Sequence, residues 1–95
     1  MNLKNYLESK KGEPVMVVCE RGYYRGIVEE VGDDGALFSH PAMIFEESSY
    51  TSEKPKEEYP IPSDLYVCFA SIEMICQPTW CFYGYENIKK TKAAG

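Results

Sequence analysis

The chain has no apolar run long enough to cross a membrane, and this absence excludes one class of protein at once. A membrane-spanning helix needs about 18 or more consecutive apolar residues, whereas the longest apolar stretch here, 65–70, has six. The chain also does not open with a basic stretch followed by an apolar segment, so the sequence predicts no signal peptide. We expect a water-soluble cytoplasmic protein with no membrane partner.

Cysteine and histidine are too few, and too scattered, to indicate a metal centre or a disulfide scaffold. Four cysteines in 95 residues are fewer than the roughly 8–10% typical of disulfide scaffolds, and none forms a C-x-x-C pair. Cys19 and Cys68 lie within apolar runs and are expected to be buried hydrophobes, whereas the state of Cys76 and Cys81 stays open. No activated thiol or oxyanion hole neighbours the single His40. We therefore predict no metal, no cofactor and no catalytic site.

Positive charge is scarce in the body of the chain. The net charge is −5, from 15 acidic and 10 basic residues. Residues 12–88 hold fourteen of the acids and only four of the bases, while the segments 1–11 and 89–95 are basic. Binding to duplex DNA requires clustered Lys or Arg to neutralise phosphates, so we expect no duplex DNA partner.

The residues that are present predict a single domain spanning 1–95. Asn2 can cap a helix over 2–11 that Gly12 ends, with Lys4 and Glu8 paired on its outer face. Apolar and β-branched runs predict the strands that follow. They span about 14–20, 23–31, 36–46, 64–70 and 72–77.

Two signals describe the second and third strands. Gly26 in mid-strand and Pro41 each indicate a bend. The segment Gly32-Asp33-Asp34-Gly35 is typical of a tight hairpin turn. With Asp34 and Gly35 as its central residues, Glu29 faces His40 and Tyr24 faces Phe45; a longer loop would shift this register.

The remaining segments are predicted to lack regular structure. Residues 47–63 are rich in Ser, Pro, Lys and Glu and read as a variable exposed loop. In the tail 78–95, the aromatic part from Trp80 to Tyr85 is expected to dock on the body, and 89–95 to fray.

The order of elements over residues 2–77 resembles the Sm/LSm family. Tyr24, Gly26 and Val28 are similar to the apolar-x-Gly-x-apolar centre of its first motif, with Leu37 as a buried position of the next strand. The resemblance implies a mostly β fold, a strongly bent five-stranded antiparallel Sm-like barrel with a short N-terminal helix. It also implies assembly of copies into a ring.

The family's RNA-binding residues do not carry over with the fold. Ile72 and Ile75 match the apolar pair of the second motif, but Cys68 and Phe69 stand where the family has Arg-Gly. The family's Asp falls on Gly32, one residue before Asp33, and its uridine-contacting Asn falls on residue 36, an alanine. The resemblance therefore implies the fold without the uridine-binding chemistry.

The last two predicted strands lack the devices that protect a sheet edge. Residues 65–70 and 72–77 carry one charge, Glu73, and neither Lys nor Pro. We predict a homo-oligomer whose interface residues are Leu65, Tyr66, Val67, Phe69, Ile72, Met74 and Ile75. Alternatively, the tail from Trp80 to Tyr85 covers these strands within one copy.

The leading hypothesis is a non-enzymatic, homo-oligomeric binding or scaffolding module with an unspecified ligand. The alternative is a single-stranded RNA-binding protein of the Sm type, in which aromatic and basic side chains stack on bases. The candidates for that stacking are Arg21, Tyr23, Tyr24, Arg25 and His40. A third class, a small cysteine-dependent enzyme, would require a reactive Cys76 or Cys81.

Overall fold

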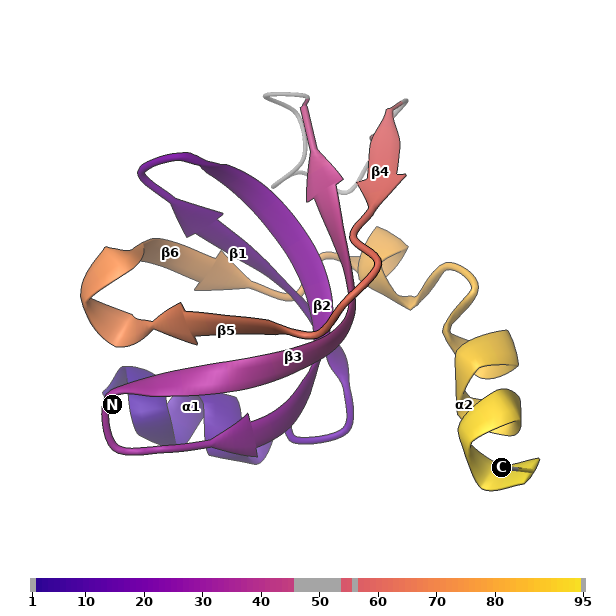
Figure 1. Ribbon diagram of the computed structural model, residues 1–95, viewed down its shortest axis with the longest axis horizontal. Helices are drawn as coiled ribbons and strands as arrows, with labels where there is room; N and C mark the ends of the chain where they lie inside the picture. The colour runs from indigo at the N-terminus through magenta and orange to yellow at the C-terminus, as the bar shows by residue number, and fades with distance from the viewer. Residues whose placement is uncertain (1, 46–53, 56, 95) are drawn as a thin grey trace.

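The computed structural model describes residues 2–45, 54, 55 and 57–94. Figure 1 shows one bent antiparallel sheet with short helices at both ends of the chain. The elements are α1 (Leu3–Ser9), β1 (Pro14–Cys19), β2 (Gly22–Val31), β3 (Gly35–Ile44), β4 (Glu58–Pro60), β5 (Leu65–Cys68), η2 (Phe69–Ser71), β6 (Ile72–Cys76), η3 (Thr79–Phe82) and α2 (Tyr85–Ala94). No described helix is long and apolar enough to span a membrane.

The strands form a continuous antiparallel sheet in the order β6-β1-β2-β3-β5, and the short β4 also pairs with β3. The predicted fold class is confirmed: the protein is mostly antiparallel β with a short N-terminal helix, and its sheet is strongly bent. Two details differ. The sheet contains six strands, and it does not close into a barrel, since β5 pairs with β3 and β6 with β1.

The bend arises where β2 and β3 lose register. Opposite Gly26, between the pairs Arg25↔Ala42 and Ile27↔Ser39, β3 has two residues, His40 and Pro41. An extra residue in one strand of a pair bends it and increases its twist, and His40 accommodates this with a φ of +49°. The bends that Gly26 and Pro41 indicated are both present.

The hairpin turn differs from the expected one. Gly32 donates its N–H to the Gly35 carbonyl at 2.8 Å, so the two aspartates are the central residues. Tyr24 consequently faces Met43, not Phe45. A second bulge at Glu29 removes its pairing with His40; instead the Glu29 carboxylate accepts the Ser39 hydroxyl at 2.6 Å.

Helix α1 lies beside the sheet and is tied to the β2–β3 turn (Figure 1). Asn2 caps it as predicted, accepting the Asn5 N–H at 2.8 Å. Lys4, however, bonds to Asp33 at 2.7 Å and not to Glu8, because the turn approaches the helix in the folded chain.

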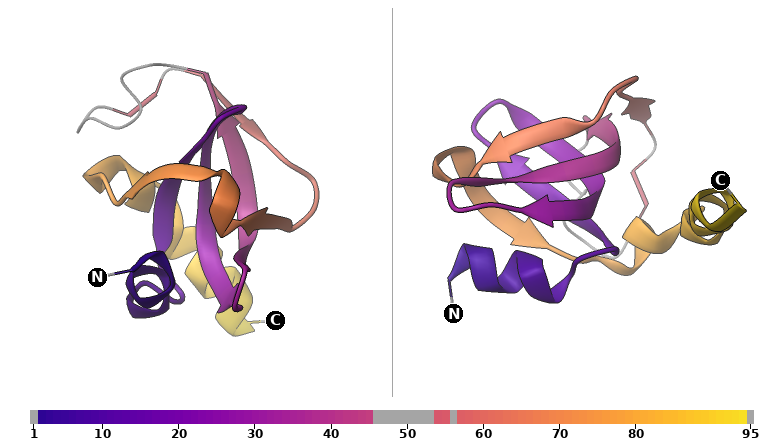
Figure 2. Two further views of the ribbon diagram at one scale, coloured as in Figure 1. Left: turned by 90° about the vertical axis from the view of Figure 1, so that its left-hand side faces the viewer. Right: turned by 60° about the horizontal axis from the view of Figure 1, so that its bottom comes forward.

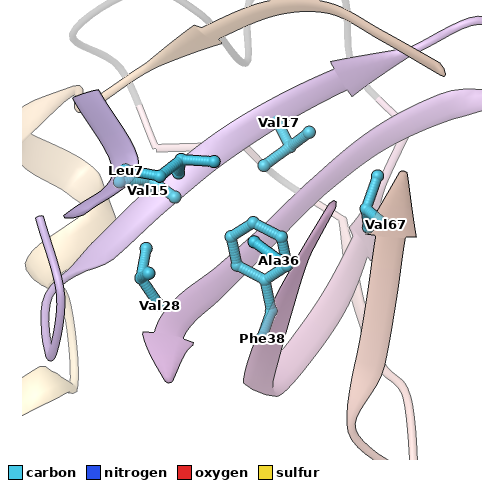
Figure 3. Close-up of a cluster of buried hydrophobic side chains, with 7 residues drawn as sticks. All are labelled: Leu7, Val15, Val17, Val28, Ala36, Phe38 and Val67. Carbon is cyan, nitrogen blue, oxygen red and sulfur yellow. The ribbon is translucent and has the colours of Figure 1, made fainter. Parts of the chain in front are cut away.

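Strand β1 is buried on both faces, which places two hydrophobic clusters on opposite sides of it. Figure 3 shows the larger cluster, in which side chains from α1 and four strands point into one interior. Its buried members are Leu7, Val15, Val17, Val28, Ala36, Phe38 and Val67. The smaller cluster consists of Met16, Ile44, Trp80 and Cys81.

Three predicted segments are corrected. Strand β4 lies within the segment 47–63 expected to be an unstructured loop, of which 47–53 and 56 are outside the described residues. Residues 69–71 form η2 instead of continuing strand 64–70. The tail forms helix α2 where fraying was expected from residue 89, and α2 projects away from the sheet (Figures 1 and 2).

Replacing Gly26 with Ala is expected to destabilise the fold. A Cβ atom at Gly26 would lie 2.9 Å from the Phe38 Cβ, and neither backbone can retreat without breaking the β2–β3 pairing. We expect a loss of about 1–3 kcal/mol, the usual cost of overpacking a core, measured by urea denaturation.

The matched control is Gly32→Ala, where the new Cβ would meet its neighbours at an ordinary 3.5 Å. This control should change the free energy of unfolding by less than about 1 kcal/mol. Equal effects of the two substitutions would contradict the role assigned to Gly26.

Candidate functional site

Strands β4, β5 and β6 each have one strand neighbour among the described residues and one open edge, and the predicted interface residues lie at β5 and β6. Phe69 donates its N–H to the Asp34 carbonyl at 2.8 Å. Because hydrogen-bonded residues alternate along an antiparallel pair, Leu65 and Val67 direct their backbone groups to β3. Tyr66 and Cys68 therefore present theirs to the open edge.

One of these edge groups is already satisfied within the chain. The Ser71 hydroxyl donates to the Cys68 carbonyl at 2.8 Å. The groups of β5 that remain for another strand are the N–H and C=O of Tyr66 and the N–H of Cys68. This short row of donors and acceptors is the feature by which an exposed strand recruits a partner strand.

The predicted interface residues divide between core and surface. Val67 is buried, and four others are partly buried against the larger cluster: Leu65, Phe69, Ile72 and Ile75. Tyr66 and Met74 are exposed, by 50% and 41%. The structure thus places six of the seven on β5 and β6 and Phe69 in η2 between them, and it leaves the side chains of Tyr66 and Met74 exposed to a partner.

A groove of about 310 Å³ runs beside β5, and we call it the β5 groove. Arg21 and Tyr24 line one wall, and the β5 residues line the other. The full set is Cys19, Glu20, Arg21, Tyr24, Leu65, Tyr66, Val67, Cys68 and Ser71. Arg21 is the single basic residue of this set.

The five predicted base-stacking residues do not gather on one surface. Arg21 and Tyr24 line the β5 groove, whereas Tyr23 packs against the smaller hydrophobic cluster. Arg25 forms an ion pair with Glu58, donates to the Tyr83 carbonyl at 3.3 Å and lies 5.9 Å from the Trp80 ring centre. His40 is exposed at the β3 bulge.

The positions where the family carries its RNA-binding residues do converge, at the β2–β3 turn and η2. Here they carry different chemistry: Ala36 is fully buried and Cys68 is exposed. Asp33 and Asp34 make the turn acidic, and Lys4 neutralises only the first of them. Asp34 instead accepts the Tyr66 hydroxyl at 2.5 Å.

A second groove, which the sequence reasoning missed, lies between β3 and β4. It measures about 500 Å³, and its exposed rings, Phe45 and Tyr59, meet edge to face with centroids 5.2 Å apart. The run Tyr59-Pro60-Ile61-Pro62 forms part of its wall. That apolar run inside an otherwise polar loop was the available signal.

The cysteines do not form a reactive or metal-binding cluster in the described part of the chain, where no three His, Cys, Asp or Glu residues gather. Burial raises the pKa of Cys76, and burial raises that of Cys81 to about 12. Both thiols therefore carry little thiolate at neutral pH, and the thiolate is the reactive form. Cys68, expected to be buried, is exposed, while Cys19 is half-buried.

The tail does not cover the open edges. Trp80 and Cys81 are buried against Met16 and Ile44, so the aromatic part docks on the body as expected. No described residue after β6 adds a strand to the sheet. Among the described residues, the tail therefore does not cover β5 and β6 by strand pairing; its aromatic part reaches β6 only through packing against Cys76.

Comparison with known proteins identifies the fold alone. No protein-family model and no curated protein matches the chain. Among solved structures, the SmAP1 heptamer of P. aerophilum is similar, with a TM-score of 0.62 and 16% sequence identity. The match covers 81% of this chain and 93% of that one, and it shows that the protein has an Sm-like fold.

The hydrogen bond from Tyr66 to Asp34 predicts a distinct titration. The Asp34 carboxylate accepts a hydrogen bond from the phenol of Tyr66 and raises the pKa of Tyr66 from 10.0 to about 12. The stabilisation from this bond is complete below about pH 10 and is lost as the pH rises through about 12. Absorbance at 295 nm should show a late tyrosine step from Tyr66 near pH 12, beside the contribution of Tyr6, whose pKa burial also raises.

Two variants assign that step. Tyr66→Phe should remove it, and Asp34→Asn should move it toward the ordinary tyrosine pKa, because the neutral amide no longer favours the protonated phenol. A late step that persists in Asp34→Asn would contradict the assigned contact.

Proposed function

We propose that this protein is a non-enzymatic Sm-like module that assembles with copies of itself. In this assembly the open edge of β5 in one copy pairs with the open edge of β6 in the next. The observation that carries the proposal is the pair of unpaired edges at the two ends of one bent sheet. The heptameric state of the structurally similar SmAP1 supports it.

The physical argument is the cost of leaving strand edges open. Pairing gives the outward backbone groups of Tyr66 and Cys68 hydrogen-bond partners on another strand. It also covers the exposed side chains of Tyr66 and Met74. The contact joins two different surfaces, so a pair of copies still has one free β5 edge and one free β6 edge. Such a contact closes into a ring when the rotation between copies divides a full turn.

The role of the assembly is binding or scaffolding. The raised pKa values of Cys76 and Cys81 weigh against the cysteine-dependent enzyme. The acidic turn formed by Asp33 and Asp34 weighs against RNA, because the family places its base-binding residues in that region. The ligand of the assembled module therefore need not be the family's ligand.

The mass of the native protein tests the assembly. Light scattering after size-exclusion chromatography at micromolar concentration should give a multiple of the 10.9 kDa chain mass. A monomer under these conditions would overturn the proposal.

Met74→Lys is expected to break the assembly while leaving each copy folded. A lysine on an exposed edge strand must be desolvated when a partner strand covers it, and natural edge strands use lysine in this way. We expect a shift to monomer, measured by the same light scattering, with an unchanged far-ultraviolet circular dichroism spectrum.

The matched control is Met43→Lys, the same substitution in β3, beside the second groove and away from the open edges of β5 and β6. It should retain the assembled mass. Loss of assembly in both variants would show a general loss of stability instead of an edge effect.

RNA binding is tested directly by fluorescence anisotropy with labelled uridine-rich and adenine-rich oligonucleotides. We expect no binding at micromolar protein, since the turn that meets η2 presents the carboxylates of Asp33 and Asp34 to the phosphates. Micromolar binding that weakens with added salt would instead establish the Sm-type RNA-binding alternative.

A further inference from the structure

The basic side chains of the body have unequal surroundings. Arg25 is held by Glu58, by the Tyr83 carbonyl and by the Trp80 ring. Arg21 is exposed on the wall of the β5 groove, and within the described residues it has no carboxylate within ion-pair distance. The guanidinium of Arg21 at the β5 groove therefore forms no ion pair within the described part of one copy.

An unused anion lies on the complementary edge. Glu73 is exposed on β6 and, among the described residues, forms no ion pair. It lies beside the end of β1, where Cys19 is the partner of Ile72. The protein therefore presents a free arginine next to its β5 edge and a free carboxylate on its β6 edge.

The direction of strand pairing decides whether these two charges meet. Every strand pair in the sheet is antiparallel. When a second copy's β6 lies antiparallel along β5, its first residues come opposite the last residues of β5. Glu73 of that copy then comes next to Cys68, which shares the β5 groove with Arg21.

We infer that Arg21 of one copy binds Glu73 of the next and that this ion pair sets the direction in which β6 enters the β5 edge. The inference rests on the proposed self-assembly and adds the residues that specify it. Parallel entry would bring Cys76 to this end of the groove and leave both charges unpaired. The pair therefore selects a second copy of this chain, in one orientation, as the occupant of the groove.

Of the two residues in the proposed ion pair, Arg21 affects assembly more, because several carboxylates surround it. Glu20 lines the same groove, and the copy's own Glu73 lies close enough to Cys19 to contribute to the rise in that thiol's pKa, after burial. The incoming Glu73 adds another carboxylate. Without Arg21 these carboxylates repel one another, and a like-charge contact at an interface rejects the partner.

Charge exchange tests the inference. Arg21→Glu and Glu73→Arg should each weaken assembly by about tenfold or more, and the double variant should restore it to within about threefold of wild type. The measurement is the dissociation constant of the assembly by sedimentation velocity over a dilution series. Lys11→Glu, the same charge change on an exposed residue beyond α1, should have no effect.

Substitutions to glutamine test the same contact with smaller changes in charge, in case the charge-reversal variants fail to fold. Arg21→Gln should weaken assembly, and adding Glu73→Gln should recover it, because the second change removes the unbalanced carboxylates. Circular dichroism melting curves report the fold of every variant. A folded Arg21→Gln that assembles like wild type would overturn the inference, as would a double variant with no recovery.

The two proposals fail in different ways. A wild-type protein that is monomeric overturns the self-assembly itself. A wild-type protein that assembles, loses assembly in Met74→Lys and ignores every change at Arg21 and Glu73 overturns only the ion pair. Added sodium chloride gives a further readout, since it should weaken wild-type assembly more than that of the doubly neutral variant.

Discussion

The close approach of β2 and β3 at Gly26 is the constraint on which the rest of the structure depends. Only a residue without a side chain permits the Phe38 Cβ to lie where it does, 2.9 Å from the place of a Gly26 Cβ. Together with the bulge at His40, this contact folds the sheet over itself. The fold then buries both faces of β1 and leaves the two terminal strands, β5 and β6, joined by η2 but not paired with each other.

In this open sheet, the side chains that hold one copy together differ from the groups that the proposed self-assembly uses. Most of the apolar side chains on the terminal strands, such as Val67 and Ile72, serve the core. The surface contribution comes from backbone groups, from Tyr66 and Met74, and from a few charges. Backbone pairing between strands contributes affinity for any partner strand, whereas charged side chains discriminate between partners. In a body with few basic residues, Arg21 therefore contributes to specificity.

This chain has an Sm-like fold but different residues at the positions where the Sm/LSm family binds RNA. The β2–β3 turn and η2 come together as the Sm-like fold requires, with Phe69 bonded to the Asp34 carbonyl. The side chains there bond to each other, Tyr66 to Asp34 and Lys4 to Asp33. A fold places a site and its residues decide the chemistry; here the residues of the turn form polar contacts with neighbouring side chains.

The sequence by itself determined the local elements, because helix caps, β-branched runs and glycine bends act over a few residues: Asn2, the 15–19 run and Gly26 were read correctly. The strand register, the formation of β4 and the ion-pair partner of each charged side chain were decided by the tertiary structure. The turn centred on Asp33 and Asp34 placed Tyr24 opposite Met43, and chain segments far apart in sequence paired Lys4 with Asp33. Such contacts depend on the summed geometry of the whole sheet, which no local pattern records.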